Sequence, residues 1–416
     1  MLAAPQAYVP LNNRLCMNEV FVARQPIYDR DLKVYAYELL FRHANVPTAE
    51  FIDGDQATSQ VILNAFTLIG LDHLVGNRKA FVNMTRGFLT AERPIPFPVD
   101  RVVLEVLEGA NPDDELLDAL RRLSRQGYTI SLDDFVYDQR LLPLVEQADI
   151  LKIELGEVAD ADLPGMVERL RNYNVKLLAE KIETHEQFER CRELGFDYFQ
   201  GYFLERPDVV GTKSIATGEL SVLRLLSALY RPNIDINELE ERISEDLSLS
   251  YKLLRYLNSA FFSLPRRVDS IRQAIVLLGT EELRAWATLL ALTAASNKPS
   301  ELMVTLMIRA KMCELLARRL GLEAPFRYFT LGLFSGLDAL LDAPLDQILA
   351  QLPLSDQMVA ALLRHEGDAG QLLRTVINYQ HGNWDKATAI VASEIVIEAY
   401  LDALRWADEA SHLSVD

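Results

Sequence analysis

Cysteine is scarce in this sequence, and its few copies are scattered. Cys16, Cys191 and Cys313 form no Cys-x-x-Cys pair and no even set that could build a disulfide framework. Such usage is typical of free thiols in a reducing compartment. The N-terminal segment also lacks the basic start and apolar run of a signal peptide. We therefore predict a cytoplasmic protein.

Long apolar runs and an excess of positive charge are missing as well. The longest apolar stretch, Ala285–Ala295, is interrupted and shorter than the ~20 residues that a membrane-spanning helix needs. Lys and Arg number 42 against 60 Asp and Glu, a net charge of −18. Nucleic-acid binding needs a clustered basic face, and anionic membranes repel acidic chains. The sequence thus predicts no membrane span and no nucleic-acid partner, and an anionic small ligand would need local cations.

What is present favours two globular domains. The chain has 416 residues, of which 50% are hydrophobic and 25% charged. In its first half, eight short β-rich runs recur, at residues 21–29, 35–42, 80–85, 101–108, 128–135, 149–155, 175–182 and 197–204. Amphipathic stretches lie between most of them, at Asp55–Ile69, Asp113–Gln126, Leu163–Tyr173 and Thr184–Leu194. This alternation predicts a TIM-like (β/α) barrel rather than a doubly wound sheet.

The second half has helical periodicity throughout and no strand pattern. We expect helices at Leu220–Tyr230, Ile236–Glu245, Leu249–Phe261, Ser270–Leu278, Glu281–Ala295, Glu301–Leu320, Pro325–Leu341, Asp356–Arg364, Ala369–Gln380 and Trp384–Trp406. The predicted domain plan is an N-terminal extension (1–19), a barrel domain (20–206), a linker (207–218) and an all-α domain (219–416).

Polar residues recur at or near the C-terminal ends of the apolar runs. They are Glu38, Arg42, Asn83, Glu105, Glu108, Asp133, Asp134, Lys152, Glu180 and Gln200. In a (β/α) barrel all strand ends converge on one mouth, where catalytic groups sit. Five of these side chains, those of Glu38, Glu105, Asp133, Asp134 and Glu180, are carboxylates that would repel one another in one crevice unless a divalent cation neutralised them. Their oxygens, with that of Asn83, suit Mg²⁺ or Mn²⁺, and two such ions often serve phosphodiester hydrolysis.

The alternative interpretation is that each acidic residue is a solvated loop residue or a helix cap. For a single position such as Asp134 that interpretation is the simpler one. Recurrence of the same residue type at the same end of five runs favours a shared site.

The barrel half resembles the EAL family of cyclic di-GMP phosphodiesterases, from about Val20 to Arg206. Seven family motifs appear in order: Glu38–Arg42 for E-A-L-x-R, Phe81–Thr85 for the Asn-bearing strand, Glu105–Glu108 for E-x-T-E, Asp133–Phe135 for D-D-F, Lys152–Glu154 for K-I-D, Ala179–Thr184 for A-E-G-V-E-T and Gln200–Phe203 for Q-G-Y-x-F. The resemblance implies hydrolysis of cyclic di-GMP to a linear dinucleotide. It also implies a barrel in which one strand runs against the others.

The resemblance also implies roles for individual residues. Glu38, Asn83, Glu105 and Asp133 would be metal ligands, with Asp134 near a second metal. Catalytic roles fall to Glu180, Lys152 and Glu38, of which Lys152 would hold the attacking water or a phosphate. Substrate would contact Arg42, Gln200 and Leu40, and the Arg42 guanidinium suits a phosphate. Glu108 would support the loop that follows Asp134.

Three departures from the family pattern bear on turnover. The second motif position is Leu39 instead of Ala. The loop after D-D-F, usually G-T-G-Y-S-S, reads Val136–Arg140 and has no glycine. K-I-D and G-V-E have become K-I-E at Lys152–Glu154 and again at Lys181–Glu183. The direct ligands are thus retained while their support has changed.

The helical half resembles the HDOD domain, from about Thr217 to Gly382. The signature is carried by Glu245–Ala260, Ser270–Ile275 and Leu277–Gly279. Related HD hydrolases carry His-Asp in a run like Gly332–Asp338, but Ser335 and Gly336 stand in those places. Neither residue can replace an imidazole or carboxylate as a metal ligand. We expect a non-catalytic domain, with a protein partner that the sequence does not identify.

Three functions remain open at this stage. The first is a divalent-metal phosphodiesterase tuned by the HDOD domain. The second is an inactive receptor that binds cyclic di-GMP, and the third is a scaffold that binds no nucleotide. Homodimer formation is also left open.

Overall fold

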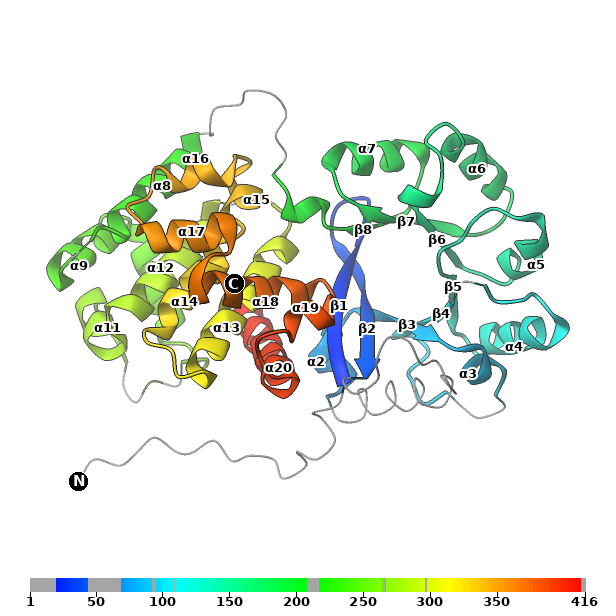
Figure 1. Cartoon of the computed structure of the whole chain (residues 1–416), viewed down its shortest axis with the longest axis horizontal. Helices are drawn as coiled ribbons and strands as arrows, with labels where there is room; N and C mark the ends of the chain where they lie inside the picture. The colour runs from blue at the N-terminus through cyan, green and yellow to red at the C-terminus, as the bar shows by residue number, and fades with distance from the viewer. Residues whose placement is uncertain are drawn as a thin grey trace.

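The computed structural model describes residues 20–43, 69–91, 95–107, 109–207, 217–232, 234–262, 264, 267–295 and 298–412. Within these ranges the chain forms two lobes side by side (Figure 1). The barrel lobe comprises the described residues up to 207, and the helical lobe comprises those from 217 onward. In the described ranges, no helix combines the length and hydropathy needed to cross a membrane. The expected extension 1–19 and most of the expected helix Asp55–Ile69 lie outside these ranges.

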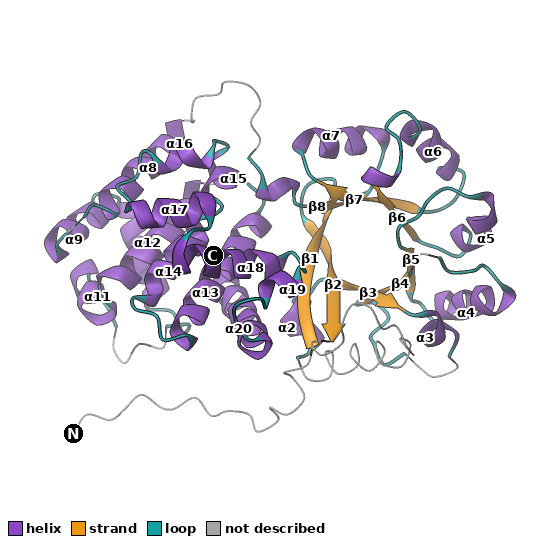
Figure 2. Cartoon of the chain, viewed as in Figure 1, coloured by secondary structure: helices purple, strands orange, loops and turns teal. Residues whose placement is uncertain are grey.

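Eight strands close into the predicted barrel (Figure 2). They are β1 (Val20–Asp29), β2 (Val34–His43), β3 (Lys79–Met84), β4 (Val102–Val106), β5 (Thr129–Leu132), β6 (Ile150–Glu154), β7 (Lys176–Ile182) and β8 (Tyr198–Gly201). Neighbouring strands from β2 to β8 are parallel. The first strand is antiparallel to both β2 and β8, which confirms the reversed strand that the resemblance implied.

The helices around the barrel begin and end at residues that favour their termini. They are α2 (Leu71–Val75), α3 (Arg86–Thr90), α4 (Asp114–Arg125), α5 (Leu142–Val145), α6 (Leu163–Leu170) and α7 (His185–Leu194). Asp113 caps α4 by accepting from the Leu116 amide, and Thr184 with Gln187 forms a capping box on α7. The predictions for α4, α6 and α7 are confirmed. The sequence did not predict α2, α3 and α5, because four or five residues are too few for a periodic pattern.

The helical lobe contains α8 (Thr217–Leu229), α9 (Ile236–Ser244), α10 (Leu247–Leu257), α11 (Ile271–Leu278), α12 (Thr280–Ala295), α13 (Ser300–Arg319), α14 (Pro325–Phe334), α15 (Leu337–Leu341), α16 (Leu345–Leu349), α17 (Asp356–Arg364), α18 (Gly367–Gln380), α19 (Trp384–Ala387) and α20 (Ser393–His412). This architecture confirms the predicted all-α half. The short α16 was not predicted.

Three predicted helix boundaries were wrong. The expected helix Pro325–Leu341 breaks at Gly336, where α13 crosses so closely that an added Cβ would lie 2.4 Å from Leu306 Cδ2. The expected helix Trp384–Trp406 divides into α19 and α20 after Thr388, whose hydroxyl donates to the Trp384 carbonyl. Helix α10 ends at Leu257 rather than Phe261, because the Asn258 side chain bonds the Leu254 and Val268 backbones.

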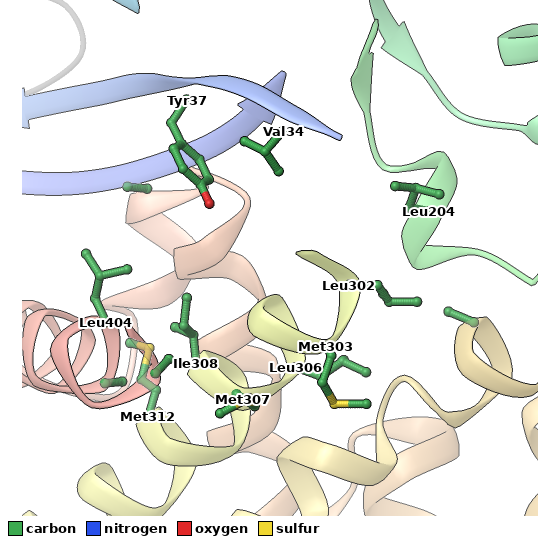
Figure 3. Close-up of a cluster of buried hydrophobic side chains, with 14 of the residues drawn as sticks. Val34, Tyr37, Leu204, Leu302, Met303, Leu306, Met307, Ile308, Met312 and Leu404 are labelled. Carbon is green, nitrogen blue, oxygen red and sulfur yellow. The ribbon is translucent and has the colours of Figure 1, made fainter. Parts of the chain in front are cut away.

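The two lobes share one hydrophobic core. Figure 3 shows Tyr37 of β2 and Leu204 of the barrel lobe beside side chains of α13, among them Leu302 and Leu306. Tyr37 donates to Glu301 of α13 at 2.9 Å, and Tyr379 of α18 donates to the Val22 carbonyl of β1 at 3.1 Å. The helical lobe therefore covers the outer face of the β1–β2 pair.

Inside the barrel, side chains form two layers. The lower layer is apolar and separate from the main core: Ile27, Ala36, Phe81, Val103, Ile150, Leu178 and Tyr198. Because side chains of a strand alternate, the residue two places nearer the mouth points inward as well. Those residues are Gln25, Glu38, Asn83, Glu105, Lys152, Glu180 and Gln200. The alternation of the strands thus places a polar layer directly above an apolar one.

Candidate metal centre at the barrel mouth

Lys152 lies at the centre of the polar layer and contacts four carboxylates. Its Nζ atom is 2.7 Å from Asp133, 2.8 Å from Glu105, 3.0 Å from Glu180 and 3.5 Å from Glu38. The Lys152 side chain is 1% exposed and that of Glu105 is 0% exposed. The structure therefore brings these five predicted site residues, from β2, β4, β6, β7 and the turn after β5, into one cluster.

The electrostatics of this cluster are dominated by burial. Burial raises the pKa of Glu105 well above its usual value, and Lys152 lowers it only in part. Burial likewise raises the pKa of Glu180, to about 8, with Glu38 and Asp133 adding to the rise. Burial lowers the pKa of Lys152, but the surrounding carboxylates outweigh it and raise the value well above the usual one. The single ammonium group of Lys152 thus contacts four acidic groups, and the cluster holds more acidic groups than cations.

Gln200 and Gln25 extend the cluster toward β1. Gln200 donates its amide to Glu38 and also, at 3.0 Å, to the Gln25 side chain. Gln200 was a predicted site residue, whereas Gln25 was not predicted. The signal for Gln25 was available, since the register pairs it with Glu38 across the antiparallel β1–β2 ladder.

The side-chain oxygens at the mouth form a candidate cation site. Oxygens of Asp133, Asp134 and Glu180 come within 4.8 Å of one another. Among the described residues, Asn83 Oδ1, Glu105 Oε2 and Glu180 Oε2 are buried and accept no hydrogen bond. Buried oxygens without donors are costly unless an ion or water completes them. The donor set is all oxygen, so the residues present fit a hard divalent cation.

Asp133 and Asp134 follow the end of β5. The Asp133 amide bonds the Val106 carbonyl, and the Phe135 amide bonds that of Lys152, so the neighbouring strands hold this turn. Asp134 has a positive φ of 44°, a conformation that aspartate tolerates better than most residues. This backbone places two consecutive carboxylates beside Glu180, where simple alternation would point them apart.

Arg42 and Leu40 lie away from the buried cluster. The Arg42 guanidinium forms two hydrogen bonds with Asp385 of α19, at 2.6 and 3.2 Å. Leu40 lies beside Gly382 of the helical lobe, whose added Cβ would be 3.4 Å from Leu40 Cδ1. Glu108, the predicted loop support, falls outside the described residues. The structure thus brings most predicted site residues together and turns these two toward the other lobe.

Two of the departures from the family motifs contact each other. Lys181, at a family glycine position, forms an ion pair with Glu154, at a family aspartate position. Lys181 has a φ of 53°, which accounts for the preference for glycine there. This pair lies at the rim beside Glu180, because Glu154 and Glu180 are register partners on β6 and β7.

The altered loop after Asp134 is held by its own contacts. Asp138 caps the 3₁₀ turn Gln139–Leu141 by accepting from the Arg140 amide, and its carboxylate pairs with the Arg140 guanidinium. Arg169 lies over the Tyr137 ring at 5.4 Å. The loop is therefore ordered locally without glycine.

In the helical lobe, Ser335 contacts a buried arginine. Its hydroxyl accepts from Arg309 Nη1 at 3.4 Å, and Arg309 pairs through Nη2 with Glu205 at 2.5 Å. Glu205 ends the 3₁₀ turn Phe203–Glu205 that follows β8. The position where HD hydrolases carry histidine thus borders an ion pair between the lobes.

Comparisons with known proteins match both lobes. The EAL domain model matches residues 80–207, and the HDOD domain model matches residues 217–369. YuxH of Bacillus subtilis, an uncharacterised protein, is 36% identical over 93% of this chain and 98% of its own. The cyclic di-GMP phosphodiesterase CdgJ of Vibrio cholerae is 32% identical over 95% of this chain and 94% of its own. A solved EAL domain protein of Listeria monocytogenes is 20% identical over 45% of this chain and 87% of its own, with a TM-score of 0.36.

Proposed function

Because the chain belongs to the EAL–HDOD family that includes YuxH and CdgJ, we propose that it is a cyclic di-GMP signalling protein whose barrel hydrolyses the nucleotide. The product would be the linear dinucleotide pGpG. The observation that carries this proposal is the cluster of buried carboxylates around Lys152, with oxygens that lack donors. An acidic pocket would repel a nucleotide with two phosphates unless cations were held there.

The metal ligands that we propose are Glu38, Asn83, Glu105, Asp133 and Asp134, with Glu180 beside them. Mg²⁺ or Mn²⁺ would suit this oxygen set. When bound, such ions neutralise phosphate oxygens and lower the pKa of a coordinated water.

The remaining roles in the reaction fall to side chains of the protein itself. Lys152 donates hydrogen bonds from the centre of the mouth, where it can orient a water or a phosphate oxygen. Burial raises the pKa of the Glu180 carboxyl group to about 8 in the metal-free protein, and a divalent cation beside it would favour the ionised carboxylate, which can then accept a proton. Gln200 fixes the Glu38 carboxylate through its amide. The apolar layer beneath keeps bulk water from entering the barrel from below.

Incubation of the purified full-length chain with cyclic di-GMP and Mn²⁺ or Mg²⁺ tests the proposal. Linear product should form, and it should disappear with EDTA and in Glu105→Gln. A matched control is Glu183→Gln, which removes an exposed rim carboxylate outside the cluster. Metal-dependent binding without product would support an inactive cyclic di-GMP receptor instead. Absence of both binding and product would support a scaffold that binds no nucleotide.

We also propose that the helical lobe acts through a protein partner in the cytoplasm. Large apolar side chains are exposed on it, with Leu247 at 82% and Tyr251 at 66% on successive turns of α10. Co-purification with these residues changed to serine tests whether this face binds a protein.

A further inference from the structure

We propose that Asp385 of the helical lobe lowers the affinity of the barrel for its nucleotide by competing with a ligand phosphate for Arg42. This inference rests on the proposed function, since it assumes that Arg42 can grip a phosphate of cyclic di-GMP. Asp385 would then be an affinity-setting residue supplied by the second domain.

The pairing of Arg42 with Asp385 is bidentate. Arg42 Nη2 lies 2.6 Å from Asp385 Oδ1, and Nη1 lies 3.2 Å from Oδ2. The two residues are 343 positions apart in sequence, so only the contact between the lobes brings them together. Their side chains are 26% and 75% exposed, which leaves the pair accessible to a ligand from solvent.

Arg42 lies on the same strand as Glu38, nearer to the C-terminal end of that strand. Glu38, Leu40 and Arg42 alternate along β2 and so lie on one face of the strand, but only Glu38 is part of the buried cluster, whereas Leu40 and Arg42 contact the helical lobe. The β2–β3 register ends at Leu39, whereas the β1–β2 register continues to His43. Arg42 therefore lies on the part of β2 that extends beyond its pairing with β3 and is paired only with β1.

The turn between α18 and α19 is anchored on this open end of the β1–β2 pair. Phe21, the register partner of Arg42, stacks on Trp384 with ring centroids 5.2 Å apart and an interplanar angle of 14°. The Arg42 guanidinium lies over the same Phe21 ring at 5.5 Å. The aromatic contact thus sets the position of α19, and with it the position of Asp385 beside Arg42.

A phosphate and Asp385 would need the same donors. Asp385 accepts one N–H from each terminal nitrogen of the guanidinium, and these two N–H groups are also the donors of an end-on bidentate phosphate contact. Among the described residues, Arg42 Nε is buried and donates to no acceptor. Bidentate binding of a phosphate by the Arg42 guanidinium therefore requires the Arg42–Asp385 ion pair to break. The free energy of that ion pair is then subtracted from the binding free energy of the nucleotide.

The size of the effect follows from the exposure of the pair. Exposed ion pairs are weak, and double-mutant cycles place them in a range that corresponds to about 1.4- to 5-fold in an equilibrium constant. Coupling of this kind is reciprocal, so bound nucleotide should also weaken the contact of α19 with the barrel lobe.

Isothermal titration calorimetry with cyclic di-GMP tests the competition, with Ca²⁺ as the divalent ion. Asp385→Asn should bind about 1.4- to 5-fold more tightly than the wild type. The matched control is Asp72→Asn, which removes an equally exposed aspartate paired with Arg101 at the opposite end of the barrel strands and should change nothing. In the Arg42→Ala background, Asp385→Asn should have no effect.

The outcomes separate the inference from the proposed function. Unchanged or weaker binding by Asp385→Asn, with normal binding by the wild type, overturns the inference alone. A gain that persists in the Arg42→Ala background also overturns it, because the gain would then come from charge removal rather than release of Arg42. If the wild type binds no cyclic di-GMP, the proposed function fails and the inference falls with it.

Discussion

The Nζ atom of Lys152 lies 2.8 Å from Oε1 of Glu105, and both side chains are sealed from solvent. A buried ion pair of this kind contributes little net stability when intact, because desolvation offsets the attraction. Losing one partner is costly, however, since the other charge is then left alone. Lys152 therefore acts as the resident counter-charge of the carboxylate cluster.

Replacement of Lys152 by methionine should destabilise the metal-free protein. We expect a loss of up to about 3–5 kcal/mol in unfolding free energy, because four carboxylates lose their common partner. Thermal unfolding in EDTA measures the loss, and added Mn²⁺ should restore much of it. The control Lys176→Met removes an exposed lysine that makes one hydrogen bond with Tyr198. Equal unfolding midpoints for Lys152→Met and wild type in EDTA would contradict this account.

The Arg309–Glu205 pair should hold the two lobes together. Arg309 is buried on α13 and also donates to Gln380 at 2.8 Å. Arg309→Met should cost up to about 3–5 kcal/mol, because the half-buried Glu205 would keep only His381 as a partner. Urea denaturation measures this cost, with Asp385→Asn as a comparison that breaks only an exposed pair between the lobes and should cost under ~1 kcal/mol. Similar losses of unfolding free energy in Arg309→Met and Asp385→Asn would contradict the prediction that the Arg309–Glu205 pair contributes more than the exposed pair.

The same pair predicts loss of stability in acid. Burial raises the pKa of Glu205, but Arg309 and His381 oppose it and bring the value down to about 2. The groups around Glu205 are Arg309, His381, Tyr28, Tyr202 and Asp338. In the unfolded chain the carboxyl titrates near its ordinary value of 4.5. The unfolded state therefore binds more protons between these values, and the stabilisation present above pH 4.5 is lost as the pH falls toward 2.

Comparison of wild type with Glu205→Gln isolates this contribution. The wild type should lose about 2–3 kcal/mol more than the variant between pH 5 and pH 2. Denaturant midpoints across this range provide the measurement. Parallel curves for the two proteins would mean that Glu205 titrates alike in both states.

The barrel and much of its site could be predicted because both depend on local patterns. Each polar site residue of β2–β4 and β6–β8 follows an inward apolar residue by two positions, as Glu105 follows Val103. That spacing is visible in the sequence, and so is the recurrence of carboxylates at strand ends. Asp133 and Asp134 also follow a strand, although the positive φ at Asp134 has no local sequence signature beyond the aspartate itself.

The contacts between the lobes could not be predicted in the same way. Arg42 carries no signal that it faces Asp385, and nothing local links Glu205 to Arg309. These partners are 343 and 104 positions apart, and their pairing depends on how two finished domains pack. The break at Gly336 has the same origin, because it is set by the crossing of α13 rather than by the helix's own sequence.

Mn²⁺ titration monitored by electron paramagnetic resonance tests the central claim most directly. The wild type should bind Mn²⁺ without nucleotide present, and Asp133→Asn should weaken binding by about tenfold or more, since even residues that only support a metal ligand contribute that much. Glu183→Gln should bind like the wild type. Failure of the wild type to bind Mn²⁺, or equal affinity in Asp133→Asn, would contradict a metal centre at the barrel mouth.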